Sequence, residues 1–362
     1  MKTKVSFPHM GNYWVVIKPL VNLVADEVIV PPPITKRTIE LGSAQSPESV
    51  CVPFKYTLGN YIEALNKGAN LLVQAGGGCR LGFYGEPQEE ILKSMGYDFD
   101  FIKLNNRSYT VGMMGEAKKY NPDLTYFQIA KAFMLSIARL KALDEFEMYL
   151  RKNIGFERQK GSFEKHLKLF LNVLDKADTL KKVRKVKKEH LRTLKQLPLD
   201  KPADPLRVGV VGELYILMEP FSNFNIEKTL GAKGVEIHRF VNISSILKEN
   251  IFKKRIRKNY LKLAKPYLHY HIGAHGTKSV GMAHKLIKDG FDGIIHVKPF
   301  ACMPEVNAMS ALQKMSRDYE VPIMYFSFDS QTSETGVLTR LEAFHDMLSM
   351  RREKIERTFP GR

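Results

Sequence analysis

The sequence predicts an α/β protein in which two parallel-sheet domains flank a helical arm. In the first hundred residues, short apolar runs alternate with segments whose apolar residues recur at helical spacing. This alternation is typical of parallel strands joined by crossover helices. We expect strands over 4–7, 26–30, 70–74 and 99–104. Helical spacing relates two sets of residues between them: Phe54, Leu58, Ile62 and Leu65, and then Ile91, Leu92 and Met95.

The middle of the chain, 121–200, is predicted to be the helical arm. Asn121 and Pro122 suit the cap and first turn of a helix, and three helical segments follow, the last of them basic. The proline-rich stretch 198–205 is the clearest linker. Beyond it we expect strands over 207–211, 235–240, 291–297 and 321–328, and helices over 244–263, 278–288 and 334–350. The predicted parts are an N-terminal α/β domain at 1–120, the arm at 121–200 and a C-terminal α/β domain at 205–362.

Composition narrows the class of protein. With 362 residues, 44% hydrophobic and 26% charged, the chain resembles ordinary soluble globular proteins. No uncharged apolar run approaches the roughly 18 residues that span a bilayer, and the first residues lack a signal-peptide core. We therefore expect a cytoplasmic protein with no membrane partner. The net charge of +18 is concentrated at 181–188 and 252–258, which are either solvated helix faces or docking faces for an acidic partner or anionic substrate. No nucleic-acid-binding motif is present, so we expect no nucleic-acid partner.

Only three cysteines occur, and their positions favour a common site. An odd, small number excludes a disulfide scaffold. Cys51 lies just ahead of a predicted helix, whereas Cys79 and Cys302 follow predicted strands, the location where open α/β sheets place ligands. Before Cys79, three glycines allow the backbone to approach an inorganic group closely: Gly76, Gly77 and Gly78. The alternatives are three unconnected buried thiols, with the glycine run serving as a phosphate loop or a tight turn.

The number of thiols indicates which metal group suits them. A structural zinc site uses four ligands, usually with close Cys-x-x-Cys pairs, and the sequence has none. A 4Fe-4S cluster normally takes four thiolates. With three, one iron keeps an open position, as chemistry at a metal requires. We therefore expect Cys51, Cys79 and Cys302 to be metal ligands.

Other side chains near these cysteines are candidates for supporting roles. Lys55 and Arg80 either tune the charge of a cluster or bind an anionic substrate, and the alternative is that they are solvated surface residues. Glu305 either approaches the open iron and shuttles protons, or interacts with the dipole of the helix that it begins. Three closely spaced histidines could bind a metal ion, but histidines of this kind are also typical of exposed loops: His269, His271 and His275.

The cysteine segments resemble the 2-hydroxyacyl-CoA dehydratase component superfamily, and in particular its branch named for a domain associated with CoA-enzyme activases. The resemblance is carried by 46–65, by the glycine-rich Cys79 loop and by 297–305. It continues in 212–223, 279–281 and 329–342, and covers nearly all of the chain except roughly 121–200.

This resemblance implies a fold and a function. In that family, three cysteines per subunit hold a 4Fe-4S cluster between Rossmann-like domains, and a separate activator hydrolyses ATP and delivers one low-potential electron. Characterised dehydratases then form a ketyl radical and eliminate water from 2-hydroxyacyl-CoA; other relatives carry a double-cubane cluster and reduce small molecules. Three cysteines suit one cubane per chain. This sequence contains neither an Asp-x-Gly phosphate loop nor a P-loop, so we expect ATP hydrolysis in a partner.

Three functions remain open at this level. The first is an anaerobic, electron-transferring reductase component that works with an ATP-dependent activator. The second is a 2-hydroxyacyl-CoA dehydratase subunit, a lyase that needs a second subunit and affinity for a CoA thioester. The third is a non-catalytic, metal-free binding or scaffold protein. A homodimer is an alternative to a second type of subunit.

Overall fold

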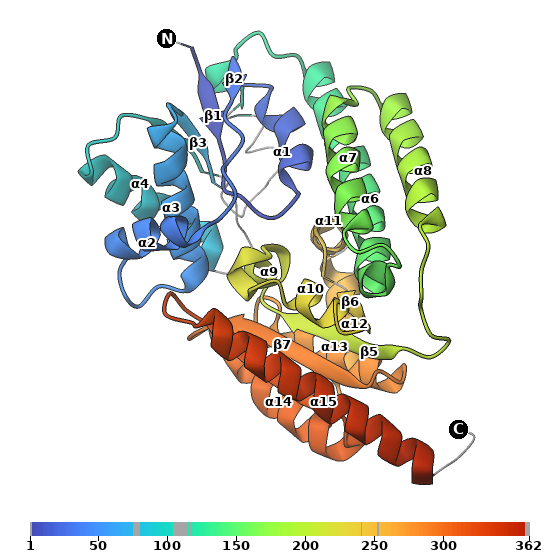
Figure 1. Cartoon of the computed structure of the whole chain (residues 1–362). Helices are drawn as coiled ribbons and strands as arrows, with labels where there is room; N and C mark the ends of the chain where they lie inside the picture. The colour runs from blue at the N-terminus through green and yellow to red at the C-terminus, as the bar shows by residue number, and fades with distance from the viewer. Residues whose placement is uncertain are drawn as a thin grey trace. The chain divides into compact units, whose positions relative to one another are not determined.

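The fold class expected from the sequence is confirmed. The computed structural model describes residues 2–74, 80–103, 115, 117–239, 241–251 and 253–358 (Figure 1). It contains two four-stranded, all-parallel sheets. The chain divides into two compact units, and each is described by itself. Unit 1 comprises Met1–Leu143 and Phe170–Lys188, and unit 2 comprises Asp144–Leu169 and Glu189–Arg362. Among the described residues, no helix is long and apolar enough to cross a membrane.

Unit 1 is built on the sheet β2-β1-β3-β4. Its elements are β1 (Lys4–Ser6), α1 (Trp14–Val21), β2 (Glu27–Val28), α2 (Lys36–Gln45), α3 (Val52–Asn66), β3 (Leu71–Val73), the 3₁₀ turn η1 (Arg80–Phe83), α4 (Gly85–Ser94) and β4 (Asp100–Ile102). Helices cover both faces of the sheet, as an all-parallel sheet requires. On one face Leu72 packs with residues of α3 and α4. On the other, Leu71 packs with Val5 and with residues of α1.

Unit 2 is built on the sheet β6-β5-β7-β8. Its elements are β5 (Leu206–Gly212), α9 (Leu214–Met218), the 3₁₀ turn η3 (Phe221–Asn223), α10 (Ile226–Gly231), β6 (Val235–Arg239), α11 (Ile243–Ile251), α12 (Lys253–Ala264), α13 (Gly276–Lys288), β7 (Gly293–Pro299), α14 (Met303–Tyr319), β8 (Ile323–Phe328) and α15 (Glu334–Thr358). Ile294 packs on one face with residues of α13 and α14. A Cβ at Gly293 would meet Phe344 and Leu348, so α15 covers the opposite face.

The predicted arm consists of three helices, α6 (Tyr126–Asn153), α7 (Ser162–Lys176) and α8 (Leu180–Gln196), with the turn η2 (Ile154–Phe156) after α6. Each of these helices contributes residues to both units. In α8, the basic residues are mostly exposed, whereas Val183, Val186 and Leu194 are buried. The basic run in this helix therefore forms a solvated face over an apolar stripe.

The predicted strands agree with the structure to within a few residues, whereas the last helix, predicted over 334–350, extends to Thr358 as α15. Several helices had no predicted range, among them α1, α2, α9 and α10. The helix α1 was not predicted because Pro19, which normally breaks a helix interior, lies inside it. The helix α2 was not predicted because its buried residues include Thr38 and Gly42, which carry no apolar period. The single helix expected over 244–263 is occupied by α11 and α12.

The two units repeat one arrangement of helix and strand. Their sheets have the same order when β1 to β4 are matched with β5 to β8, and α3 precedes β3 as α13 precedes β7. Three pairs of residues separated by 222 positions occupy equivalent places: Gly59 with Gly281, Gly68 with Gly290, and Asn70 with Asp292. We call residues related by this separation matched positions.

Each matched pair has the same structural role in both units. A Cβ at Gly59 would lie 1.9 Å from the Thr38 carbonyl oxygen of the preceding helix, and one at Gly281 would lie 2.8 Å from that of Tyr260. Gly68 and Gly290 end their helices with φ of 88° and 78°, a conformation that favours glycine.

The third pair bonds the neighbouring strand in the same way. The backbone N–H of Lys4 donates to Asn70 Oδ1, and that of Arg207 donates to Asp292 Oδ2, both at 2.7 Å. The correspondence therefore extends to individual hydrogen bonds.

Candidate functional site

Cys51 is the residue that begins α3. Its backbone is extended, with φ −70° and ψ 152°, and Pro53 lies in the first turn of the helix, where the missing N–H would have no intrahelical partner. The sulfur lies 3.0 Å from the Tyr84 hydroxyl. Tyr84 is held by an edge-to-face contact with Phe54, with ring centroids 4.9 Å apart. The half-buried thiol of Cys51 is thus positioned by α3 and by the start of α4.

Cys302 begins α14 in the same way. Its backbone is extended, and Pro304 lies in the first helical turn. The chain leaves β7 at Pro299, three residues earlier, and Ala301 takes φ 60° to turn into the helix. The neighbouring side chains of Phe300 and Met303 are 65% and 63% exposed. Both cysteines therefore share the form Cys-x-Pro at a helix start, and both are thiols of intermediate exposure.

A helix start is a favourable place for a metal-binding thiol. The first-turn N–H groups carry partial positive charge and stabilise a thiolate, which is the form that binds metal. The described part of the donor set therefore fits a thiolate-ligated group such as an iron–sulfur cluster. Cys51 belongs to unit 1 and Cys302 to unit 2. Cys79 and the glycines before it, Gly76, Gly77 and Gly78, lie outside the described residues. Arg80 begins η1.

The histidine group does not form a metal site in the structure. Within the described ranges, no three His, Cys, Asp or Glu side chains come together as a metal-binding group. His271 Nδ1 instead lies 2.7 Å from Thr277 Oγ1, at the start of α13. His275 is the residue that precedes this helix.

Lys55 lies one helical turn beyond Cys51 on α3 and is half-buried. Residues four apart on a helix share a face, so this lysine is near enough to influence the charge around Cys51. Its backbone carbonyl has a separate role, because a Cβ at Gly42 would lie 1.7 Å from it. The close crossing of α2 and α3 thus fixes the backbone of this segment.

Glu305 lies inside unit 2 rather than at its surface. It is the third residue of α14 and is 1% exposed. Its Oε2 lies 2.8 Å from Nε2 of His296, which is on β7 and fully buried. Its Oε1 accepts a hydrogen bond of 3.1 Å from the hydroxyl of Ser279 on α13. We call Ser279, His296 and Glu305 the acid–base cluster.

Further ionisable groups surround the acid–base cluster. Glu213 begins α9 and accepts a hydrogen bond from the Ile216 N–H. Burial raises the pKa of Glu213 to about 7 despite this bond, and the nearby Glu305 raises it further. Burial lowers the pKa of Lys298, while Cys302 and Glu305 act in the opposite direction. Within unit 2, Lys298 therefore links Cys302 electrostatically to the acid–base cluster, and Glu305 links this cluster to Glu213.

A tyrosine from the neighbouring strand completes these surroundings. The ring of Tyr325 on β8 lies 5.8 Å from that of His296, and burial raises the pKa of Tyr325 to about 12. Neither His296 Nδ1 nor the Tyr325 hydroxyl has a hydrogen-bond partner among the described residues. Sequence reasoning singled out Glu305 but missed His296 and Ser279, because no local spacing relates α13, β7 and α14.

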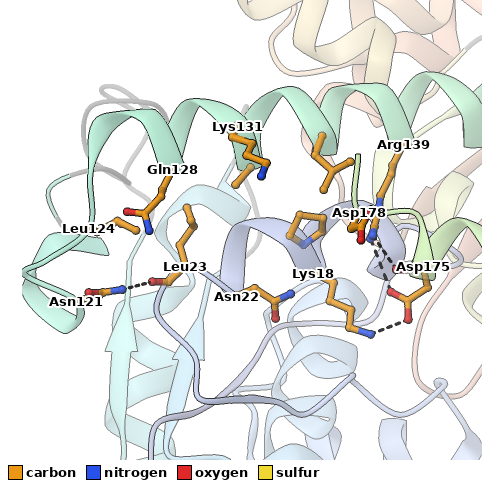
Figure 2. Close-up of a pocket in the computed structure, with 13 residues that line it drawn as sticks. Lys18, Asn22, Leu23, Asn121, Leu124, Gln128, Lys131, Arg139, Asp175 and Asp178 are labelled. Atoms are coloured by element: carbon orange, nitrogen blue, oxygen red, sulfur yellow. Dashed lines mark hydrogen bonds and ion pairs between the residues drawn. The ribbon is translucent and has the colours of Figure 1, made fainter. Parts of the chain in front are cut away.

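The cavity found in unit 1 contains none of the predicted site residues. It has a volume of about 540 Å³ and lies among α1, α6 and the turn between α7 and α8. Figure 2 shows Lys18 and Arg139 directed toward Asp175. Arg139 also donates to the carbonyls of Asp175 and Ala177 at 2.7 and 3.2 Å. These bonds tie α6 to the end of α7, so the charged wall of this cavity has a structural role.

Comparisons with known proteins give no independent assignment. No protein-family model matches the chain, and no curated protein matches it in sequence.

Proposed function

We propose that this chain is an iron–sulfur protein that uses Cys51, Cys79 and Cys302 as thiolate ligands of a 4Fe-4S cluster. It acts as the electron-accepting component of a reductase or dehydratase system and works with a separate ATP-hydrolysing activator. The observation that carries this proposal is the shared placement of Cys51 and Cys302. Each begins a helix in the form Cys-x-Pro, and each remains a thiol.

The surroundings of these cysteines support the assignment. Backbone N–H groups of α3 and α14 favour the thiolate form at both positions. The Tyr84 hydroxyl at 3.0 Å supplies a hydrogen-bonding partner for the Cys51 sulfur. Such bonds to ligand sulfur adjust the reduction potential of a bound cluster. When bound, the cluster supplies one-electron transfer at an iron that keeps an open position.

A true 2-hydroxyacyl-CoA dehydratase subunit is the second candidate function. The exposed basic face of α8 favours it, because a CoA thioester or an acidic partner subunit carries complementary negative charge. An elimination assay with hydroxyacyl-CoA thioesters, an activator and ATP distinguishes this candidate from a reductase component. Water elimination supports the dehydratase, and electron acceptance without elimination supports the reductase.

The test of the cysteine assignment is a metal analysis of anaerobically purified protein. We expect roughly four iron and four sulfide per chain in the unaltered protein. The variants Cys51→Ala, Cys79→Ala and Cys302→Ala should each lose most of the iron, because a ligand is removed. Met350→Ala, which changes an exposed side chain of α15, is the control and should retain it. Full iron retention by all three cysteine variants would refute the ligand assignment, and iron-free unaltered protein would favour the metal-free alternative.

A further inference from the structure

The acid–base cluster of unit 2 has a neutral counterpart in unit 1. The matched position of Ser279 is Thr57, and that of His296 is Gln74. Gln88, the fourth residue of α4, takes the place that Glu305 has as the third residue of α14. Its Nε2 donates a hydrogen bond of 2.7 Å to Thr57 Oγ1. Each unit therefore joins the helix before its third strand to the helix after it through buried polar side chains.

The counterpart shows that the structural role does not require ionisable groups. Gln74 and Gln88 are each 2% exposed, as buried as His296 and Glu305. In unit 1, the polar bond between α3 and α4 joins two neutral groups, the Gln88 amide and the Thr57 hydroxyl. Burying a carboxylate and an imidazole costs considerably more free energy than burying amides, unless their bonds compensate fully. The ionisable pair in unit 2 therefore calls for an explanation other than packing.

The arrangement does not support nucleophilic catalysis by Ser279. In a serine-hydrolase triad the histidine lies between the serine and the carboxylate, so that it accepts the serine proton. Here Glu305 lies between the other two, and the Ser279 hydroxyl donates to the carboxylate. Both the histidine ring and the serine hydroxyl therefore bond to Glu305, and the serine is a hydrogen-bond donor to this carboxylate.

The arrangement does suit the holding of one proton. A carboxylate and an imidazole 2.8 Å apart can share a proton in either direction. A second buried carboxylate, Glu213, interacts with the first, and two neighbouring buried carboxylates resist ionising together. Lys298 interacts electrostatically with both Cys302 and Glu305. Added negative charge at Cys302 would therefore favour protonation of the acid–base cluster.

We propose that Ser279, His296 and Glu305, together with Glu213, form a buried proton-holding site beside the start of α14. If a cluster that Cys302 helps to hold accepted one electron from a low-potential donor, the His296–Glu305 pair would take up one proton from solvent, and oxidation would release it. Charge then balances, since one electron and one proton enter together. This coupling rests on the function proposed above, whereas the proton-holding site itself does not.

The matched positions supply the variant that tests the site. In H296Q/E305Q, unit 2 carries the glutamines that unit 1 has at Gln74 and Gln88. These side chains fill equivalent buried places in unit 1, so the variant should fold, as circular dichroism and thermal unfolding will show. Gln74→Glu in unit 1 is not a suitable control, because it adds a charge; an exposed-residue variant, Met350→Ala, serves instead.

The first measurement is a proton titration of metal-free protein between pH 5 and 9. We expect the unaltered protein to release one proton more than H296Q/E305Q, and Met350→Ala to match the unaltered protein. Equal titration curves for the unaltered protein and the double variant would overturn the proposal of a proton-holding site, whether or not the chain binds iron.

The second measurement is a redox titration of iron-loaded protein at several pH values. Uptake of one proton per electron changes the reduction equilibrium tenfold per pH unit, which is 59 mV for a one-electron couple. We expect this dependence in the unaltered protein and its loss in H296Q/E305Q at equal iron content. A dependence that survives in the double variant would overturn the coupling. Protein without iron would instead contradict the proposed function, and the proton titration would still decide on the site.

Discussion

Replacing Glu213 by glutamine should make the protein more stable at alkaline pH. Burial raises the pKa of Glu213 from its ordinary value of 4.5 to about 7. Between these two values the folded state binds more protons than the unfolded state, so the free energy of unfolding falls as pH rises through this range. Each pKa unit corresponds to about 1.4 kcal/mol, and the total therefore amounts to about 3 kcal/mol. Glutamine carries no charge and escapes this loss.

The substitution preserves the local structure. Glu213 Oε2 accepts the Ile216 N–H at 3.0 Å and so caps α9. A glutamine side-chain oxygen can accept the same bond, so the helix start is retained. We therefore expect E213Q to be about as stable as the unaltered protein at pH 5 and about 3 kcal/mol more stable at pH 8.

Urea unfolding followed by circular dichroism at pH 5, 6, 7 and 8 measures this difference. Glu356→Gln removes an exposed carboxylate of α15 and is the matched control; it should leave the free energy of unfolding unchanged at every pH. A difference between E213Q and the unaltered protein that stays constant across the series would refute ionisation of Glu213 as the cause, since a constant difference reports packing.

Two further predictions concern the repeated arrangement in unit 1. Gly59→Ala should destabilise the protein by about 3 kcal/mol or more, because the new Cβ would lie 1.9 Å from the Thr38 carbonyl oxygen. Gly336→Ala, at an exposed helical position, is the control and should stabilise the protein by about 0.5–1 kcal/mol. Thermal unfolding compares the two variants, and equal unfolding midpoints would contradict the close crossing of α2 and α3. Gln88→Glu places a carboxylate beside Thr57 with no histidine at the matched position, and we expect a loss of about 3 kcal/mol at pH 8 that shrinks toward pH 5. Urea unfolding at the two pH values tests this, and a loss that is independent of pH would be evidence against burial of the new charge.

The sequence contains enough periodicity to predict the sheets but not the features that cross between elements. The apolar run at 291–297 predicts a buried strand, and β7 is there. The same run contains His296, which looks like one polar residue in an apolar strand. Its meaning depends on Glu305, nine residues later on another element, and on Ser279, seventeen residues earlier. Only the fold brings these side chains within hydrogen-bonding distance.

The residue-by-residue correspondence between the two units was not visible in the sequence, for a physical reason. Packing constrains only the few positions where backbones approach or turn, and these are the positions at which the units still agree: Gly59 with Gly281, and Gly68 with Gly290. Apolar side chains elsewhere can be exchanged for others of similar volume at small cost. Three matched pairs separated by 222 positions are too few to reveal the repeat from the sequence alone. They become recognisable once both segments are known to join a helix to the third strand of a sheet.

Because the chain contains the same arrangement of helix and strand twice, residues of unit 1 can be compared with those at the equivalent places in unit 2. Where both units keep a residue type, as at the helix-ending glycines, the shared backbone geometry explains it. Where they differ in chemistry but not in place, packing cannot be the reason for the difference. Gln88 and Glu305 make equivalent helix-to-helix bonds at equivalent depth, yet only Glu305 meets an imidazole and a second carboxylate. An amide is sufficient to join the two helices, so joining them does not explain the ionisable pair of unit 2. The free energy that burial of this pair costs is therefore explained by a function of the pair.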